Sequence, residues 1–236
     1  MGILGIISGT IAVEKSDLLK DCKTLIVSND YGKSCILVTD KIALIPRHGN
    51  DPKEHTPPHL INHRANLQAL KDLGAAEVVA LNSTGSLQKD LCPGMIVIPD
   101  DFINLTATPT IYQNKAVHVV PSLNESIRRK LLRAANNCQI PVVEKGIYWQ
   151  TTGPRLETKA EIRMMANFAD IVGMTMASEA VIAQESGLSY ASICSVDNFG
   201  NGLAEKPLSL KEIMAGARKN AAAMMRIIQN YMELSS

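Results

Sequence analysis

The sequence predicts one α/β domain, built on a central mixed and largely parallel β-sheet that is flanked by helices. Short runs rich in β-branched residues alternate with longer segments of helical periodicity along the chain. The short runs are apolar at nearly every position, which is typical of strands buried on both faces. A chain of 236 residues can bury a large core within one such domain.

Eight short apolar runs are expected to form the strands. Each is four to seven residues long, and at this length an enrichment in Val and Ile favours a strand over a helix. They are "ILGIIS" (3–8), "KTLIVS" (23–28), "CILVT" (35–39), "IALIPR" (42–47), "EVVALNS" (77–83), "GMIVIP" (94–99), "IVGM" (171–174) and "YASICSV" (190–196).

Five segments have the apolar spacing of helices. They span 60–73, 122–137, 158–168, 177–186 and 209–233. The last opens with "SLKE", in which Ser209 as N-cap and Glu212 three residues later are typical of a capping box. Its apolar stripe is expected to pack on the sheet and contains Ile213, Ala217, Met224 and Ile227.

Nothing in the sequence marks a second domain, so residues 1–236 are expected to form a single one. There is no internal repeat, low-complexity tract or Pro-rich linker. No apolar run approaches the roughly 20 residues that a membrane-spanning helix needs. The apolar N-terminus has no basic region before it, which favours a first buried strand over a signal peptide and a cytoplasmic location.

The composition favours a small-molecule ligand. The net charge is +1 and there are only one Trp, three Phe and five Tyr, so no basic stripe interleaved with aromatic residues is present for a nucleic acid. Five cysteines, an odd number without CxxC spacing, indicate neither a disulfide framework nor a zinc site. We therefore expect reduced cysteines and no bound metal.

Polar or small residues follow four of the predicted strands. Residues 9–10 (Gly-Thr), 47–49 (Arg-His-Gly), 82–86 ("NSTGS") and 174–175 (Met-Thr) occupy these positions. In open α/β sheets, ligands collect at the carboxyl ends of strands. A guanidinium, hydroxyl donors and unhindered backbone amides are the groups that bind a phosphate oxyanion. The pattern predicts an anion site at this edge of the sheet.

Each of these features has a plainer interpretation by itself. A Gly-Thr pair after a strand is usually a turn, a Thr before a helix is usually an N-cap, and the Arg-His pair can lie on the surface. "NSTGS" lacks the Lys of a Walker loop, and "GILGIISGT" lacks the full GxGxxG spacing of a dinucleotide site. Only the convergence of four such strand ends favours the anion site.

Taken in order, the motifs resemble a known family. "GIISGT", "LIPRHGNDPKEHTPPHLINHRANLQALKDLGA", "NSTGSL", "PGMIVIPDDFIN", "GIYWQTTGPRLETKAEI" and "DIVGMTMASEAVIAQESGLSYASI" are similar to the trimeric purine nucleoside phosphorylase and methylthioadenosine phosphorylase family. The resemblance covers essentially the whole chain. It implies the nucleoside phosphorylase fold and an enzyme that cleaves a purine nucleoside with inorganic phosphate, giving free base and a ribose 1-phosphate.

The resemblance implies a phosphate site and no cofactor, since inorganic phosphate is a co-substrate. By position, the phosphate site contains Thr10, Arg47, His48, the backbone N–H of Ser83, and Thr175. Met174 matches the residue beneath the ribose. Phosphate held below C1′ would stabilise and then capture the oxocarbenium-like sugar. Each contact made only in the transition state can contribute about 2 to 4 kcal/mol.

Two further positions imply the base. Glu157 matches a carboxylate that accepts from N1–H of a 6-oxopurine, and Asn198 matches the amide that bonds N7 and O6. The methylthioadenosine members carry a small hydroxyl residue and an Asp there. A carboxylate facing the unprotonated N1 of adenine would set acceptor against acceptor and discriminate against adenine. Leu156 replaces a Phe that stacks on the base.

These base positions leave alternatives open. Without the family, Glu157 is most simply an exposed loop charge or a helix N-terminal carboxylate, because Thr158 begins a helical pattern. Asn198 is then a turn residue beside Gly200. A shift of one residue would place Asp197 at the base and favour an adenine nucleoside.

The 5′ end of the sugar is implied by two residues. Leu210 matches an aliphatic position of the methylthio-nucleoside enzymes, where enzymes for a free 5′-hydroxyl have a His. His118 matches a residue that reaches the neighbouring subunit's site in a trimer; its plainer interpretation is a strand histidine bonded locally. The expected substrates are methylthioinosine, inosine or guanosine. The alternatives are a methylthioadenosine phosphorylase, a nucleoside hydrolase and a silent nucleoside-binding protein.

Overall fold

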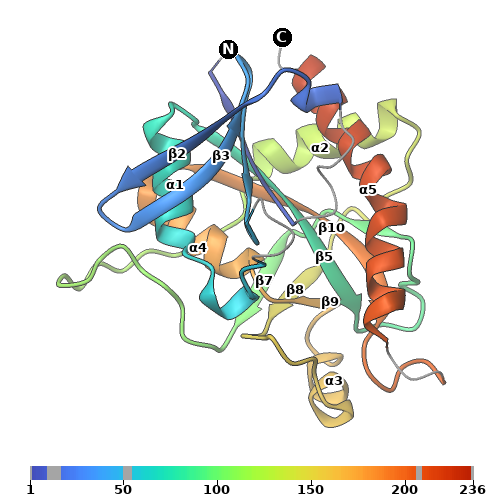
Figure 1. The fold of residues 1–236 in the computed structure, drawn as a ribbon. Helices are drawn as coiled ribbons and strands as arrows, with labels where there is room; N and C mark the ends of the chain where they lie inside the picture. The colour runs from blue at the N-terminus through green and yellow to red at the C-terminus, as the bar shows by residue number, and fades with distance from the viewer. Residues whose placement is uncertain (1, 10–16, 50–54, 206–208, 235–236) are drawn as a thin grey trace.

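The order of strands in the central sheet determines where a ligand can bind. The computed structural model describes residues 2–9, 17–49, 55–205 and 209–234, and within these residues ten strands join in one sheet (Figure 1). The strands are β1 (Leu4–Ser8), β2 (Lys23–Asn29), β3 (Gly32–Val38), β4 (Ile42–Pro46), β5 (Glu77–Ser86), β6 (Ile96–Val97), β7 (Asp101–Asn104), β8 (Ile147–Gln150), β9 (Ile171–Gly173) and β10 (Ser189–Phe199).

The sheet is mixed, with a parallel centre. Its main path runs β2-β3-β4-β1-β5-β9-β8-β7, and β10 pairs with β5 and β6 away from this path. β1 is parallel to β4 and β5, and β10 is parallel to β5. The hairpin of β2 and β3 adds antiparallel strands at one end. The predicted mixed, largely parallel α/β sheet is confirmed.

The described chain contains five α-helices, four of which cover the faces of the sheet. They are α1 (His63–Asp72), α2 (Glu125–Asn137), α3 (Lys159–Met165), α4 (Met176–Ser186) and α5 (Leu210–Glu233), with two 3-10 turns, η1 (Asp17–Leu19) and η2 (Pro58–Leu60). Figure 1 shows α1 and α4 on one side of the sheet and α2 and α5 on the other. All five predicted helices are present, with ends that differ by up to three residues.

The central strands are buried on both faces, as their sequences predict. Side chains of neighbouring strand residues point to opposite faces, so Ile7 joins the core beneath α1 and α4 whereas Ile6 joins the core beneath α2 and α5. Val78 and Val79 of β5 divide in the same way. This explains why the runs are apolar throughout and do not alternate.

Two strands were not predicted from the sequence. β7 and β8 are four residues each and pair in parallel with each other, and β8 pairs with β9. The predicted strand at 94–99 contributes only Ile96 and Val97 to the ladder. Helix α5 starts at Leu210, directly after Ser209, but the side chain of Glu212 lies outside the described residues. None of the helices described here is long and apolar enough to cross a membrane.

The neighbours of β5 change along its length and leave a fork in the sheet. β5 pairs with β1 as far as Leu81, and on the same edge it pairs with β9 from Gly85 onward. Residues 82–84 therefore have no neighbouring strand on this edge within the described chain, while β10 covers the other edge. Backbone groups in such a fork are free to meet a ligand.

Candidate functional site

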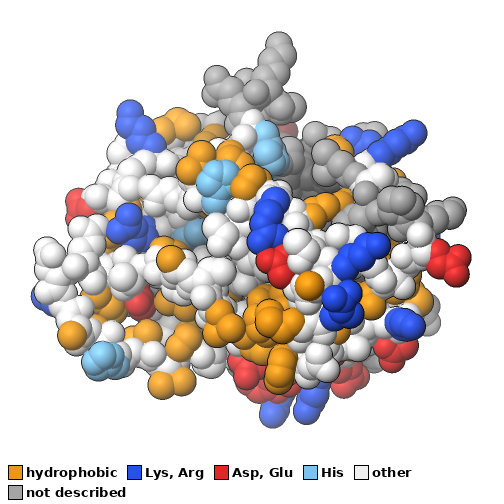
Figure 2. Space-filling model, turned by 90° about the horizontal axis from the view of Figure 1, so that it is seen from below, with side chains coloured by type: hydrophobic (Ala, Val, Ile, Leu, Met, Phe, Trp, Pro, Cys, Tyr) orange, Lys and Arg blue, Asp and Glu red, His pale blue; other side chains and the backbone are white. Residues whose placement is uncertain are grey.

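A cavity of about 660 Å³ opens at this fork. On the face turned toward the carboxyl ends of β5 and β10, histidine and basic side chains lie beside hydrophobic ones (Figure 2). Eight of the predicted site residues line the cavity: Arg47, His48, Ser83, Leu156, Glu157, Met174, Thr175 and Asn198. Residues more than a hundred positions apart in the chain therefore meet at one site, as the strand-end argument predicted.

Arg47 follows β4 and is held from several sides. It is only 5% exposed. Its Nη1 donates to Thr175 Oγ1 at 3.1 Å and its Nη2 donates to the Ile7 carbonyl at 3.1 Å. Its Nε lies 3.0 Å from Oε1 of Glu179 on α4. The guanidinium is therefore a buried, oriented cation at the wall of the cavity.

Thr175 is oriented as a hydrogen-bond donor to the cavity. It precedes α4, yet its side chain makes no capping bond. Its Oγ1 accepts from Arg47 Nη1 and from Asn82 Nδ2 at 2.9 Å. A hydroxyl has two acceptor lone pairs and one proton, so the proton of Thr175 is left for another acceptor. The positive end of the α4 dipole adds to the attraction for an anion here.

Asn82 is itself oriented by a second hydroxyl. Ser192 Oγ on β10 donates to Asn82 Oδ1 at 2.9 Å, which turns the Asn82 amide N–H groups toward Thr175. Sequence analysis did not single out Asn82, although it belongs to the "NSTGS" segment. Asn82 can donate to Thr175 because it lies inside the fork and because Ser192, 110 residues away in the chain, orients its amide.

His48 lies beside Arg47 as a neutral imidazole. Its Nδ1 is 2.8 Å from the Thr56 carbonyl, which can only accept, so Nδ1 carries the proton. Burial lowers the pKa of His48 to about 4, and Arg47 and His55 act in the same direction. The His55 ring stacks on it with centroids 4.6 Å apart and also lines the cavity. His55 was not among the predicted residues.

Glu157 points inward and does not cap the helix. It is 8% exposed, and Thr151 Oγ1 donates to its Oε1 at 2.7 Å. The capping box of α3 is formed by Thr158 and Glu161 instead, and Glu161 also pairs with Arg155. The interpretation of Glu157 as an exposed loop charge is therefore wrong, and although it directly precedes the N-cap of α3, it takes no part in the capping box. Glu157 also borders a second cavity of about 230 Å³.

A bulge in β10 gives the side chains of the adjacent residues Asp197 and Asn198 different surroundings. The register with β5 shifts between Val196 and Asn198, so Asp197 is the extra residue. Asn198 lines the cavity, whereas Asp197 accepts from Asn220 of α5 at 3.1 Å and from Ser195 at 3.0 Å. Burial raises the pKa of Asp197. The structure thus presents Asn198 to the cavity and holds Asp197 against α5.

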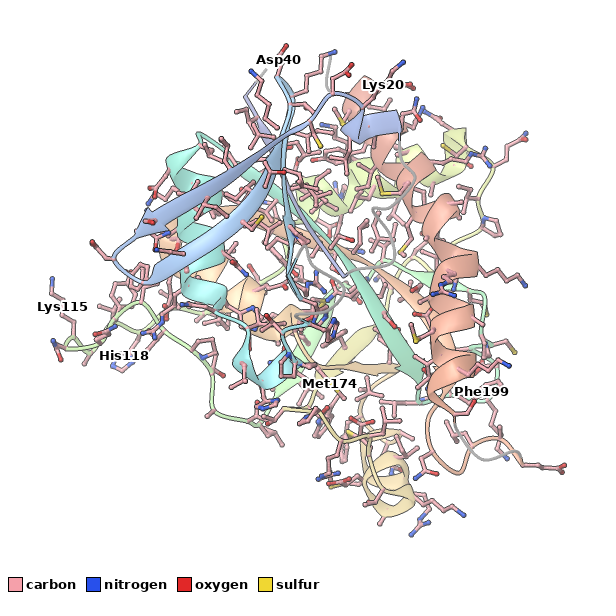
Figure 3. All side chains as sticks on the ribbon, viewed as in Figure 1. Lys20, Asp40, Lys115, His118, Met174 and Phe199 are labelled. Carbon is pink, nitrogen blue, oxygen red and sulfur yellow. The ribbon has the colours of Figure 1, made fainter. Side chains whose placement is uncertain are left out.

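The loop before Glu157 lies close to Met174. Gly153 has φ of +66°, and a Cβ there would clash with Met174 Sδ, so the approach requires glycine. Met174 lines the cavity at the junction of β9 and α4 (Figure 3). Leu156 is 43% exposed at the rim. Leu156 and Met174 thus both belong to the cavity wall, and Gly153 borders the second cavity.

Helix α5 supplies a wall that is mainly apolar. Ile213, Met214 and Ala217 line the cavity from its first two turns, and Arg218 lines it directly after them. The predicted 5′ residue, Leu210, is the first residue of α5, but its side chain lies outside the described residues, and so does Thr10 altogether. Ile213 and Ala217, which belong to the apolar stripe predicted to pack on the sheet, thus line the cavity instead.

His118 lies apart from this cavity. It is exposed in the loop between β7 and α2, which projects away from the body (Figure 3). Met174 and His118 are well separated in this view. Within one chain the structure therefore does not bring His118 to the site, and its role toward a neighbouring subunit stays a prediction. No group of three or more His, Cys, Asp or Glu side chains in the described chain could hold a metal ion.

A family model described as the phosphorylase superfamily matches residues 5–233. The chain belongs to the phosphorylase superfamily. The resemblance predicted from the motifs is thereby confirmed.

Relatives of this phosphorylase have names from both branches of the family. A probable 6-oxopurine nucleoside phosphorylase of Archaeoglobus fulgidus is 41% identical over 232 residues, covering 96% of this chain and 94% of that protein. A probable S-methyl-5′-thioinosine phosphorylase of Methanocaldococcus jannaschii is 35% identical, with 97% and 91% covered. An S-methyl-5′-thioadenosine phosphorylase of Pyrococcus abyssi is 37% identical, with 80% and 74% covered.

A solved structure shares the fold of this phosphorylase. Methylthioadenosine phosphorylase from Schistosoma mansoni, in complex with adenine, matches with a TM-score of 0.88 and 30% identity, covering 99% of this chain and 92% of that one.

Proposed function

We propose that the protein cleaves the N-glycosidic bond of 6-oxopurine nucleosides with inorganic phosphate, giving free base and a ribose 1-phosphate for purine salvage. The observation that carries this proposal is the buried carboxylate of Glu157 in the same cavity as Arg47 and Thr175. Purine nucleoside phosphorolysis is also the activity named for its relatives.

The anion side of the cavity supports phosphate as the nucleophile. Arg47 supplies a fixed positive charge, and Thr175 has a hydroxyl proton to donate. Ser83 lies in the fork, where its backbone N–H is unhindered by a neighbouring strand. Water needs no such set of donors, so the site favours a phosphorylase over a hydrolase. Phosphate held by these groups could stabilise the positive charge that develops on the sugar.

The base side supports a 6-oxopurine. Glu157 and Asn198 both line the cavity, so a carboxylate is available to accept from N1–H of hypoxanthine or guanine and an amide is available for N7 and O6. Adenine presents an acceptor at N1 and would meet the carboxylate unfavourably. The bulge that keeps Asp197 away from the cavity supports Asn198 as the base residue.

The 5′ side favours an apolar group. Ile213, Met214 and Ala217 line the cavity from α5, and a methylthio group would bury its surface against them. We therefore include 5′-methylthioinosine with inosine and guanosine as candidate substrates. S-methyl-5′-thioadenosine is the alternative substrate, because a relative named S-methyl-5′-thioadenosine phosphorylase matches 80% of the chain.

A phosphorolysis panel tests the proposed function. Base release from inosine, guanosine, adenosine, methylthioinosine and methylthioadenosine is measured with and without phosphate. We expect phosphate-dependent release that is faster for the three 6-oxopurines. Faster turnover of the two adenine nucleosides would refute the base assignment. Equal release without phosphate would indicate a hydrolase, and binding without turnover a silent binding protein.

Asn82→Ala is expected to weaken phosphate binding selectively. Without the Asn82 amide, the Thr175 hydroxyl can turn its proton away from the anion, while Ser192 loses one acceptor and keeps the Ala80 carbonyl. We expect the KM for phosphate to rise roughly tenfold, which corresponds to about 1.4 kcal/mol, with a nucleoside KM changed less than twofold. Initial-rate kinetics with each substrate varied in turn measure both. A rise in the nucleoside KM alone would assign Asn82 to the sugar or base.

We also propose a homotrimer in the cytoplasm that uses no cofactor. Support for a subunit interface comes from the loop between β7 and α2, which contains His118 and the exposed apolar side chains Leu105, Val117 and Val120. In such an assembly His118 would reach a neighbouring site. Sedimentation analysis should give a trimer; a fully active monomer would exclude a shared site.

A further inference from the structure

Four buried polar side chains from different elements meet behind the anion side of the cavity. Arg47 follows β4, His63 belongs to α1, Glu179 to α4 and Tyr190 to β10. Their exposed fractions are 5%, 7%, 0% and 2%. Arg47 lines the cavity, but the other three are not among the described residues that do. A fully buried carboxylate is unfavourable unless it is paired, so Glu179 calls for a physical explanation.

Glu179 contacts the Nε and Nη2 edge of the Arg47 guanidinium, whereas Thr175 contacts Nη1. Its Oε1 lies 3.0 Å from Arg47 Nε and its Oε2 lies 3.5 Å from Nη2. Tyr190 donates to Oε2 at 2.7 Å and so fixes the carboxylate. The Ile7 carbonyl takes a further N–H of Nη2. These contacts occupy the Nε and Nη2 edge of the guanidinium and leave the Nη1 side, next to Thr175, directed at the cavity.

The contact between Glu179 and Arg47 is close but not well aligned. Arg47 Nε, Glu179 Oε1 and His63 Nδ1 are buried atoms that make no hydrogen bond of good geometry within the described chain. His63 Nδ1 lies 3.9 Å from Oε1, and burial lowers the pKa of His63 to about 3, so this ring is neutral and adds no charge. Hydrogen bonds at ligand sites often align only when the ligand is bound.

A carboxylate near a phosphate site has two opposing effects. It repels the incoming anion, but it also holds the arginine that attracts it. Here Glu179 contacts Arg47 directly at 3.0 Å, whereas phosphate would bind beyond the guanidinium. Because the Coulomb interaction weakens with distance, the attraction between Glu179 and Arg47 outweighs the repulsion between Glu179 and phosphate. A buried arginine without a counter-ion would otherwise be free to turn toward solvent.

We propose that Glu179 is a positioning residue that acts through Arg47, with Tyr190 fixing its carboxylate, so that the guanidinium presents its Nη1 side to phosphate. This inference rests on the proposed phosphate-dependent function. It predicts that changes at Glu179 and Tyr190 alter phosphate binding, although neither residue borders the cavity.

Glu179→Gln and Tyr190→Phe test the inference. Phosphate affinity is measured by calorimetry without nucleoside, and the KM values of phosphate and nucleoside are measured separately. Outer contacts of this kind typically change ligand affinity by roughly 10- to 100-fold at metal sites. We expect phosphate binding to weaken about tenfold in Glu179→Gln and less in Tyr190→Phe, with the nucleoside KM within about twofold of wild type. Tyr190→Phe removes one oxygen and keeps the test informative if Glu179→Gln unfolds.

Glu125→Gln is the matched control. Glu125 is an exposed helix-start carboxylate that pairs with Arg128 and Arg129 on α2, and its replacement should leave phosphate affinity unchanged. Unchanged or tighter phosphate binding in both test variants would overturn the inference, and so would an equal loss for nucleoside. If the wild-type protein binds phosphate and cleaves nucleosides, and both variants bind phosphate with wild-type affinity, only this inference fails. If wild type binds no phosphate, the proposed function fails with it.

Discussion

Arg47→Lys should lower kcat/KM for phosphate by about 10²- to 10³-fold, the typical cost of removing a fixed donor to a developing charge. Lysine keeps the positive charge but has no planar fork. It cannot contact the Ile7 carbonyl, Thr175 Oγ1 and Glu179 together while facing an anion, as the guanidinium does. Steady-state kinetics with varied phosphate measure the loss.

The control for this variant is Arg129→Lys. Arg129 is exposed on α2 and pairs with Glu125, so its replacement should change neither rate nor affinity. Arg47→Ala is a harsher change, because Glu179 would be left as a buried, unpaired charge. Such losses typically cost about 3–5 kcal/mol of folding stability, which thermal unfolding would detect. If Arg47→Lys keeps a phosphate KM within about twofold of wild type, this arginine does not bind the anion.

The parts of the fold predicted from sequence are those in which local pattern and tertiary burial agree. Strands such as β1 are apolar throughout because helices cover both faces, so the run itself reveals the strand. β7 and β8 have only four residues each; β7 joins the sheet by pairing with β8, and β8 by pairing with β9. Such short strands carry too little periodicity to be recognised alone.

The sequence predicted the site residues that directly follow a strand. It missed the residues whose side-chain orientation depends on partners far away in the chain. Arg47 and Thr175 could be found from their positions. The use of Asn82 as a donor depends on Ser192, and the separation of Asn198 from Asp197 depends on a bulge. A sequence pattern records neither the direction of an amide nor an extra residue in a strand.

The position of α5 relative to β10 also depends on a contact between residues that are distant in the sequence. A Cβ at Gly216 would clash with the Asp197 carbonyl, so this glycine lets the helix approach the bulged strand closely. That approach brings Ile213 and Met214 to the cavity. The helix was predicted from its apolar stripe, but its distance from β10 was not, because it depends on backbone contact.

Glu157→Gln should reverse the preference between the two classes of base. Thr151 donates to Oε1 of residue 157, and a glutamine there would keep this bond by placing its carbonyl oxygen toward Thr151. Its NH₂ group would then face the base. N1–H of hypoxanthine or guanine would meet a donor, whereas the unprotonated N1 of adenine would meet a suitable partner. Kinetics on the paired substrates inosine and adenosine, and on methylthioinosine and methylthioadenosine, measure the change.

We expect kcat/KM for the 6-oxopurines to fall about 10²-fold in Glu157→Gln, since a donor is set against a donor in a desolvated site. The adenine nucleosides should lose little or gain. Glu161→Gln is the matched control, because Glu161 lies four residues away but caps α3 and pairs with Arg155; it should leave the substrate ratio unchanged. Equal losses on both classes would mean that Glu157 supports the loop through Thr151 without recognising the base. A shift confined to the 6-oxopurines would identify this carboxylate as the group that distinguishes hypoxanthine or guanine from adenine.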